Sequence, residues 1–252
     1  MSHPDRPSIG CIFAHPDDET FCVGGIVAKY AAAGHEVHLW CATDGDAGKN
    51  AGVPVSSPEQ LAGLRRRELA DAARILGISS VELGHYRDGE LARADPTSLV
   101  ADIVGFIRRR RPTVILTFGP EGAPTGHADH AATSRVATAA FFLSGLATSH
   151  PDQNLPPHHA ARLYFHAWDF PLAEKRLKLE SVPGVGTARI DVRAFKEKKS
   201  AAFAAHATQQ GSSGVFFSSA FPDVEVLAFA AGVPQPAPIV DDVFAGLSGL
   251  DG

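Results

Sequence analysis

The first apolar run of the chain, Ile9-Gly10-Cys11-Ile12-Phe13-Ala14, leads directly into the polar sequence His15-Pro16-Asp17-Asp18-Glu19. The length of this run and its β-branched and aromatic residues predict a buried strand. A helical pattern follows over residues 20–33 and stops at Gly34, a residue type that commonly ends helices. A buried strand joined to a helix through a polar turn is the unit from which parallel α/β sheets are built.

The same alternation of strand and helix continues along the chain to residue 149. Further strands are predicted at 36–42, 81–83 and 113–118, and further helices at 58–76, 98–110 and 127–143. Because strands such as Val114-Ile115-Leu116 are continuously apolar, the sheet should be covered on both faces. The pattern predicts an α/β protein with a doubly wound, mostly parallel, Rossmann-like sheet and helices on both faces.

The pattern changes after residue 149. Strands are predicted at 162–168 and 189–192, a helix at 194–209, and then a tail from Gly211 that is rich in Gly, Ser, Phe and Pro. We expect one domain over residues 1–252, in which residues 1–149 form the Rossmann-like core and residues 150–252 a smaller C-terminal extension. The phenylalanines of the tail could serve a contact between copies, so a homo-oligomer is one expected assembly.

Composition narrows the classes of function. The chain has 252 residues and a formal net charge of −5, from 23 basic and 28 acidic residues, so no nucleic-acid partner is expected. No stretch reaches the roughly 18 apolar residues of a membrane helix, and the first residues, MSHPDRPS, lack the apolar segment of a signal peptide. A cytoplasmic protein without a membrane partner is expected. The three cysteines have no CxxC spacing, which argues against a cysteine-based zinc site.

Two polar clusters follow predicted strands, at the sheet edge where open α/β folds bind ligands. One is His15-Pro16-Asp17-Asp18, and the other is Gly126-His127-Ala128-Asp129-His130. Catalytic zinc is commonly held by two histidines and a carboxylate, and His15, Asp18 and one histidine of the second cluster supply that set. Asp17 would remain as a base beside a metal-bound water. Either cluster alone could be the capped start of a helix with solvated side chains. To replace the metal site, that explanation would have to hold for both clusters at once, which is less expected than for one.

The same two clusters resemble known family motifs. Residues 14–19 resemble the AHPDDE signature of the LmbE-like, or PIG-L, family of zinc-dependent N-acetylglucosamine deacetylases. Residues 126–130 resemble its GHPDH motif, with Ala128 where proline is usual, a change that removes a rigid φ but no chemical group. The resemblance runs from about residue 9 to 209 and includes the shorter pieces Thr43-Asp44-Gly45, Arg65-x-x-Glu68 with Leu76-Gly77, Asp88-Gly89 and His206-Ala207-Thr208-Gln209.

The resemblance implies a metal-dependent hydrolase that removes an N-acetyl group from an N-acetylglucosamine-type sugar or conjugate. The cofactor would be Zn²⁺, with Fe²⁺ as the alternative, because histidine and carboxylate sites accept both. The implied metal ligands are His15, Asp18 and His130.

The resemblance also assigns roles around the metal. Asp17 is implied to be the general base. His127 is implied to be an oxyanion stabiliser or proton donor that Asp129 orients. The residues implied to bind the small-molecule substrate are Arg65, Asp88 and His206. A lone histidine on a helix is equally typical of a packed or surface residue, and His206 could be one.

Other functions fit part of the pattern. The substrate could be a different N-acyl amide or a thiol conjugate. Two histidines and a carboxylate also form the iron site of non-haem oxygenases, but those enzymes are as a rule β-barrels, whereas strands and helices alternate here. A non-catalytic sugar- or dinucleotide-binding module is a third interpretation. No GxGxxG follows the first strand, and a binding module would not need Asp17 and Asp18 together beside His15.

Overall fold

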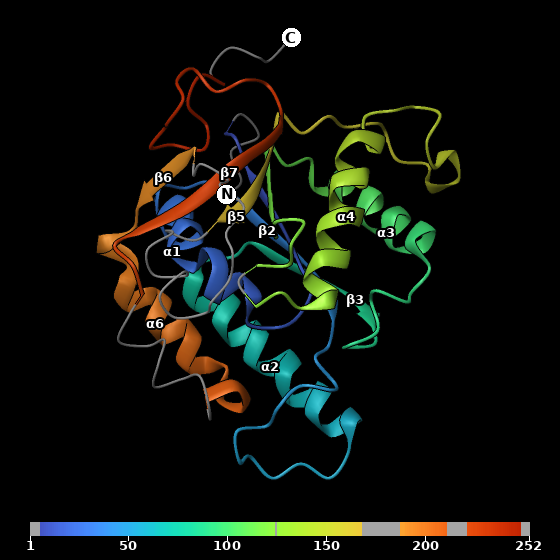
Figure 1. Cartoon of the computed structure of the whole chain (residues 1–252), viewed down its shortest axis with the longest axis vertical. Helices are drawn as coiled ribbons and strands as arrows, with labels where there is room; N and C mark the ends of the chain where they lie inside the picture. The colour runs from blue at the N-terminus through green and yellow to red at the C-terminus, as the bar shows by residue number, and fades with distance from the viewer. Residues whose placement is uncertain (1–5, 124, 168–186, 211–220, 248–252) are drawn as a thin grey trace.

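The structure, a computed structural model, describes residues 6–123, 125–167, 187–210 and 221–247. One sheet contains seven strands in the order β3-β2-β1-β4-β5-β7-β6 (Figure 1). The strands are β1 (Ile9–Phe13), β2 (Val37–Thr43), β3 (Ser80–Tyr86), β4 (Val114–Thr117), β5 (Arg162–Ala167), β6 (Ala188–Asp191) and β7 (Val224–Gly232). Trp168, which the sequence assigns to a strand, and residues 211–220 and 248–252 of the tail lie outside the described residues.

The five strands from β3 to β5 pair in parallel, and β7 runs antiparallel to both β5 and β6. The predicted doubly wound, mostly parallel sheet with a C-terminal extension is therefore confirmed. The chain winds outward from β1 in one direction to β2 and β3, and later in the other direction to β4 and β5. A crevice forms at such a reversal, outside the carboxyl ends of the two central strands, here β1 and β4.

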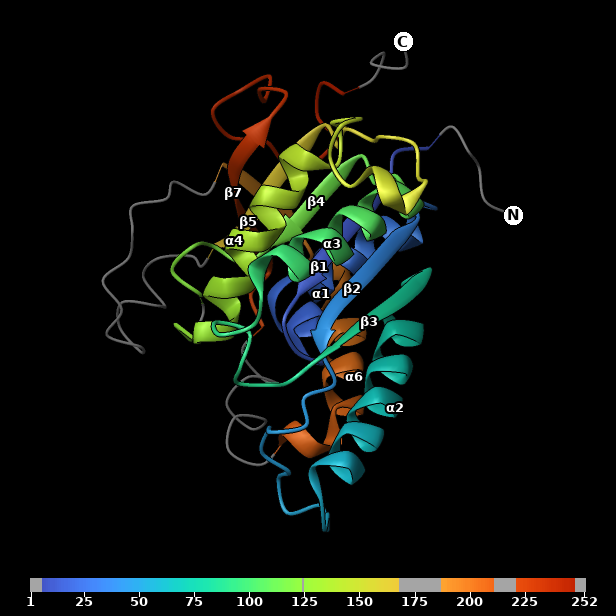
Figure 2. The same ribbon diagram turned by 90° about the vertical axis from the view of Figure 1, so that its right-hand side faces the viewer.

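Helices cover both faces of the sheet (Figures 1 and 2). On one face lie α1 (Asp18–Ala32), α2 (Pro58–Leu76) and α6 (Lys196–Ala205), and on the other α3 (Pro96–Arg110) and α4 (Ala128–Leu143). Short 3₁₀ turns occupy Pro151–Gln153, Arg193–Phe195 and Ala207–Gln209. Within the described ranges, no helix combines the length and apolarity needed to cross a membrane.

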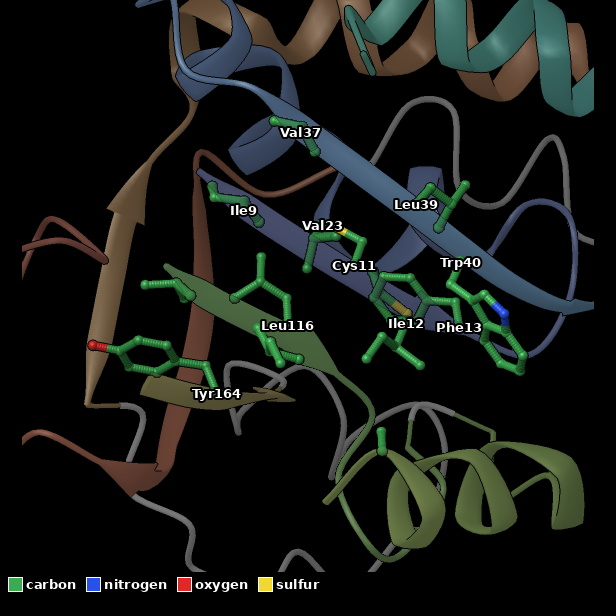
Figure 3. Close-up of a cluster of buried hydrophobic side chains, with 14 of the residues drawn as sticks. Ile9, Cys11, Ile12, Phe13, Val23, Val37, Leu39, Trp40, Leu116 and Tyr164 are labelled. Carbon is green, nitrogen blue, oxygen red and sulfur yellow. The ribbon is translucent and has the colours of Figure 1, made fainter. Parts of the chain in front are cut away.

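The central strands β1, β2 and β4 are buried along their whole length, as their continuous apolar sequences predict. Figure 3 shows side chains of these strands, including Cys11, Leu39 and Leu116, packed into one core. All three cysteines are buried free thiols. This burial fixes the carboxyl ends of β1 and β4 at the crevice between them.

Several elements differ from the sequence prediction. The helix predicted over 194–209 is α6 with a 3₁₀ turn on either side, because the backbone leaves the helical conformation at His206, where φ is −79° and ψ is 62°. Strand β3 covers Ser80–Tyr86 where 81–83 was predicted.

Helix α1 starts at Asp18 rather than at residue 20, and its backbone breaks at Val23, where φ is −135° and ψ is 17°. Figure 3 shows Val23 within the core beside Cys11. Strand β7 was not predicted, because it lies in the tail beyond Gly211 that offered no clear pattern.

Candidate active site at the carboxyl ends of β1 and β4

The two predicted clusters meet at the crevice between β1 and β4. The turn after β1 carries His15 and Asp18, and the start of α4 carries His127 and His130. The rings of His15 and His127 have centroids 5.0 Å apart, and those of His15 and His130 are 5.3 Å apart. The fold thus brings together side chains that are more than a hundred positions apart in sequence.

Asp18 lies between two imidazoles. Its Oδ2 is 3.3 Å from Nδ1 of His15, and its Oδ1 is 3.2 Å from Nε2 of His130. The backbone N–H of His15 also donates to Asp18 Oδ2 at 2.8 Å. Burial alone would raise the pKa of Asp18, but His130 and His15 hold that pKa well below its ordinary value. Asp18 is therefore kept as an anion, the form in which a carboxylate binds a metal.

The other edge of the His15 ring faces two further carboxylates. Nε2 of His15 lies 3.0 Å from Oδ1 of Asp88 and 3.2 Å from Oδ2 of Asp129. Burial works against the charged ring, but Asp129, Asp18 and Asp88 together raise the pKa of His15 well above its ordinary value. The Asp129 carboxylate also accepts the backbone N–H groups of Gly89 and Leu91 at 2.7 and 3.1 Å. Asp129 thus ties the loop after β3 to the site.

The donor set fits a divalent metal ion. Nitrogens of His15, His127 and His130 lie within 4.8 Å of one another, as do the ligand atoms of His15, Asp88 and Asp129. Nδ1 of His130 is buried and has no hydrogen-bond partner among the described residues, while Phe118 stacks on the ring at 4.0 Å between centroids. Histidine nitrogens and carboxylate oxygens that converge at one buried point are the ligands that a divalent ion such as Zn²⁺ takes in proteins.

Asp17 occupies a strained position next to this cluster. Its φ of 115° is one that residues with side chains rarely adopt, and its backbone N–H donates to Oε2 of Glu19 at 3.0 Å. It is the N-cap residue of α1, yet its carboxylate makes no capping hydrogen bond to that helix. Burial raises the pKa of Asp17 to about 6, and the nearby Arg65 guanidinium opposes the rise. The carboxylate is left available to accept a proton.

Comparison with known proteins places this arrangement in a family. The family described as PIG-L (GlcNAc-PI de-N-acetylase) matches residues 11–141. A 1D-myo-inositol 2-acetamido-2-deoxy-alpha-D-glucopyranoside deacetylase of Rhodococcus jostii (strain RHA1) is 35% identical, over 79% of this chain and 80% of the relative. The chain belongs to the PIG-L family.

Two solved structures share the fold of this PIG-L member. The N,N'-diacetylchitobiose deacetylase from Pyrococcus horikoshii aligns over 90% of this chain and 84% of its own, with a TM-score of 0.74 and 22% identity. The 4-carboxy-2-hydroxymuconate hydratase from Pseudomonas putida KT2440 aligns over 92% and 98%, with a TM-score of 0.69 and 22% identity. Since one is a hydrolase of acetyl groups and the other a hydratase, the fold alone does not decide the reaction.

The PIG-L motif residues at the start of α4 have distinct contacts. Nδ1 of His127 accepts the backbone N–H of Asp129 at 3.2 Å, so a neutral ring carries its proton on Nε2. Burial and the rings of His15 and His130 lower the pKa of His127, which favours the neutral form. The sequence suggested that the Asp129 side chain orients His127, whereas here it contacts His15 and only its backbone reaches His127. Ala128, in place of the family's proline, is the first residue of α4, where proline is helpful but not required.

Arg65 links the two sides of the PIG-L site. Its guanidinium donates to the carbonyls of Gly45 and Pro16 at 3.1 and 2.5 Å and lies 3.4 Å from Oδ2 of Asp17. A Cβ on Gly45 would collide with this guanidinium, which explains the glycine of the Thr43-Asp44-Gly45 piece. Arg65 and Asp88 both line the pocket, as residues predicted to bind substrate should, but backbone carbonyls already hold both terminal nitrogens of Arg65, and its buried Nε has no hydrogen-bond partner among the described residues.

The pocket above these residues has a volume of about 420 Å³. Besides the predicted site residues, its lining includes Phe21, Lys49, Thr125, Phe203 and Gln209. Gln209 was part of a family piece that received no role, and it is fixed by donating to the carbonyl of Lys49 at 2.7 Å. The sequence did not indicate that Phe21, Lys49, Thr125 and Phe203 line the pocket. They belong to none of the motifs, and they reach the pocket only because the fold brings distant segments together.

His206 lies in a different place from the one predicted. It is fully buried and does not line the pocket, and its Nε2 is 3.0 Å from Oε1 of Glu19. Burial alone would lower the pKa of His206, but Glu19 raises it. Glu19 in turn accepts the backbone N–H of Asp17. His206 is therefore connected to Asp17 through Glu19 and does not face the pocket in which we expect the substrate.

Replacing His206 by Phe keeps the ring volume but removes the nitrogen that faces Glu19. We expect kcat to fall roughly 10- to 100-fold, because small displacements of a reacting group are costly, while KM stays nearly constant. Steady-state kinetics check this, with His159→Phe in an exposed loop as the control. A higher KM with unchanged kcat would return His206 to the substrate-binding role.

His127→Ala tests the second histidine of the cluster. Loss of a donor to a developing oxyanion typically lowers kcat by about 10²–10³-fold, and we expect a loss of that size with the metal still bound. Turnover and elemental analysis of the purified variant measure the two effects. If the variant instead loses its metal, His127 rather than His130 belongs to the ligand set.

Proposed function

We propose that this chain is a metal-dependent N-deacetylase that hydrolyses the acetamido group of an N-acetylglucosamine conjugate. The observation that carries the proposal is the meeting of His15, Asp18 and His130 beside a strained, uncapped Asp17 in one pocket. The family of the chain supports the same activity. The relative from Rhodococcus jostii is named for a conjugate of N-acetylglucosamine and inositol, and we extend that substrate class to this chain.

His15, Asp18 and His130 would hold the metal, for which we propose Zn²⁺ with Fe²⁺ as the alternative. When bound, the ion would make a nearby water more acidic and polarise the amide carbonyl. One structural neighbour is the zinc-inhibited form of a teicoplanin deacetylase, which is another protein of this fold that interacts with zinc.

The side chains of the pocket account for the proton movements. Asp17 accepts a proton from the attacking water while the water oxygen bonds to the acyl carbon. His127 donates a hydrogen bond from Nε2 to the oxygen on which negative charge develops. As the carbon–nitrogen bond breaks, Asp17 returns the proton to the amine, so the products are acetate and a free amino sugar.

Release of acetate from a panel of N-acetylglucosamine conjugates tests the proposal. The panel includes an inositol conjugate, N,N'-diacetylchitobiose and free N-acetylglucosamine, each incubated with protein loaded with Zn²⁺. We expect acetate and a free amine in equal amounts, with the inositol conjugate as the best substrate. The same protein is also incubated with 4-carboxy-2-hydroxymuconate. Hydration of this compound, with no acetate released from any conjugate, would show that the chain is a hydratase and not a deacetylase.

Several predictions from the sequence stay predictions. Among them are the single domain over residues 1–252, the roles of the site residues, the cytoplasmic location and the association of copies into a homo-oligomer. A measurement of molecular mass in solution by light scattering checks the association of copies directly.

A further inference from the structure

The break in α1 lies just behind the active-site turn. The helical turn before Val23 follows Asp17 and contains Asp18, and the longer part of the helix resumes at Gly24. A break in a helix leaves backbone N–H groups on one side and carbonyls on the other without helical partners. The orientation of the first turn is therefore set by whatever satisfies these groups.

Two charged side chains of the C-terminal extension fill the break. Glu225 of β7 accepts the backbone N–H groups of Gly25 and Ile26 at 2.9 and 2.8 Å. Lys199 of α6 donates to the carbonyl of Phe21 at 2.8 Å and to Glu225 Oε1 at 2.7 Å. The carboxylate thus caps the second part of the helix, and the ammonium caps the first.

The surroundings are shaped for this pair. Lys199 is 2% exposed and Glu225 is 4% exposed. A Cβ on Gly25 would lie 2.8 Å from Glu225 Oε1, and a Cβ on Gly24 would lie 3.2 Å from Cγ of Lys199. Gly25 therefore leaves room for Val192 and for the Glu225 carboxylate, and Gly24 leaves room for the aliphatic part of the Lys199 side chain.

A buried ion pair is a costly way to gain stability, because apolar residues of similar volume often serve as well or better. The pair here does something that apolar residues cannot do, since it binds both ends of a broken helix at once. The helical turn that the pair fixes begins directly after Asp17. Its first residue, Asp18, contacts His15 and His130.

We propose that Lys199 and Glu225 are positioning residues that set the Asp17–Asp18 turn against the histidines of the site. This inference rests on the proposed function. In Figure 1, α1 lies between the sheet and α6, which agrees with a connection from the C-terminal extension to the active-site turn.

Glu225→Gln is the first test, because it keeps the shape of the side chain and removes its charge. We expect the affinity for Zn²⁺, measured by competition with a chelator, to fall about 10- to 100-fold, the usual effect of losing an outer partner of a metal site. We expect kcat to fall with it and KM to change little. Lys199→Met, which keeps the apolar part of the side chain and removes the ammonium, should lower Zn²⁺ affinity and kcat in the same way.

A matched control exists between the same two elements. Lys196 of α6 binds Asp223, just before β7, at 2.7 Å, but this pair is exposed and does not reach α1. The Lys196→Met and Asp223→Asn variants should leave Zn²⁺ affinity and kcat unchanged. Exchanging the charges in the double variant Lys199→Glu, Glu225→Lys keeps an ion pair but turns an ammonium toward two N–H groups. It should not restore function, and full recovery would overturn the capping role.

A measurement on the unaltered protein covers the case in which Glu225→Gln does not fold. If the pair couples the helix break to the metal turn, Zn²⁺ must slow hydrogen exchange at the amides of Gly25 and Ile26, because coupling between sites is reciprocal. The amide of Ile103 in α3 serves as the reference. Unchanged exchange at Gly25 and Ile26, or a folded Glu225→Gln with full Zn²⁺ affinity and kcat, would overturn the positioning role. Absence of acetate release and of Zn²⁺ binding in the unaltered protein would instead overturn the proposed function.

Discussion

Asp17→Asn is expected to keep its metal and lose most of its turnover. The amide matches the carboxylate in size and can still accept a hydrogen bond from Arg65, which lies 3.4 Å away. It cannot take a proton from water, and loss of a general base typically lowers kcat by about 10²–10⁴-fold. Acetate release gives the rate, and elemental analysis should still find about one divalent ion per chain, as expected for a three-ligand site.

Asp71→Asn is the control for this substitution, because Asp71 is an exposed carboxylate of α2 that pairs with Arg74. It should match the unaltered protein in rate and metal content. Near-normal turnover of Asp17→Asn would show that another group accepts the proton, even if the metal site is as proposed.

Asp18→Ala is expected to lose both the metal and the activity. The carboxylate contacts His15 and His130 at 3.3 and 3.2 Å, so its removal leaves two imidazoles without the anion between them. Without a bound ion, water keeps its ordinary acidity, and we expect turnover to fall by more than about 10³-fold. Metal content by elemental analysis and acetate release on the same sample measure both losses.

Asp95→Ala provides a demanding control. Asp95 also begins a helix, and its carboxylate accepts the N–H groups of Thr97 and Ser98 at 3.1 and 3.2 Å. Removing this cap should cost about 1 kcal/mol of stability without affecting metal or turnover. If Asp18→Ala behaves like Asp95→Ala and retains its metal, the ligand set has to be drawn from the three histidines or from His15 with Asp88 and Asp129.

The fold was predictable where local signals agree. Helix α2 has the predicted bounds because Ser57 caps its start, Pro58 occupies the first turn and Gly77 ends it with φ of 89°. Strand β7 escaped prediction because it lies in the tail rich in Gly, Ser, Phe and Pro, and only the distant Lys199 explains the buried charge of Glu225 near its start. The break at Val23 was hidden because the groups that satisfy it are about 200 positions away.

The candidate site was also predictable only where the local sequence carries the signal. The residue types next to the strand ends marked His15, Asp18 and one histidine of the second cluster, because the carboxyl ends of β1 and β4 must share one edge. Only the family resemblance selected His130 over His127. The contacts of Asp129 and His206 could not be foreseen, because they depend on which face of a loop or helix turns inward. Asp129 turned toward His15, and His206 toward Glu19.

The position of β7 has a consequence for biosynthesis. This strand follows β6 in the chain but lies between β5 and β6 in the sheet, and it brings Glu225 to α1. A nascent chain that has emerged only as far as β6 therefore holds every histidine and aspartate of the site, yet lacks the strand that completes the sheet and the group that caps the broken helix. Since domains are synthesised from the N-terminus, ribosome-bound chains that lack β7 should bind the metal ion more weakly than the finished protein.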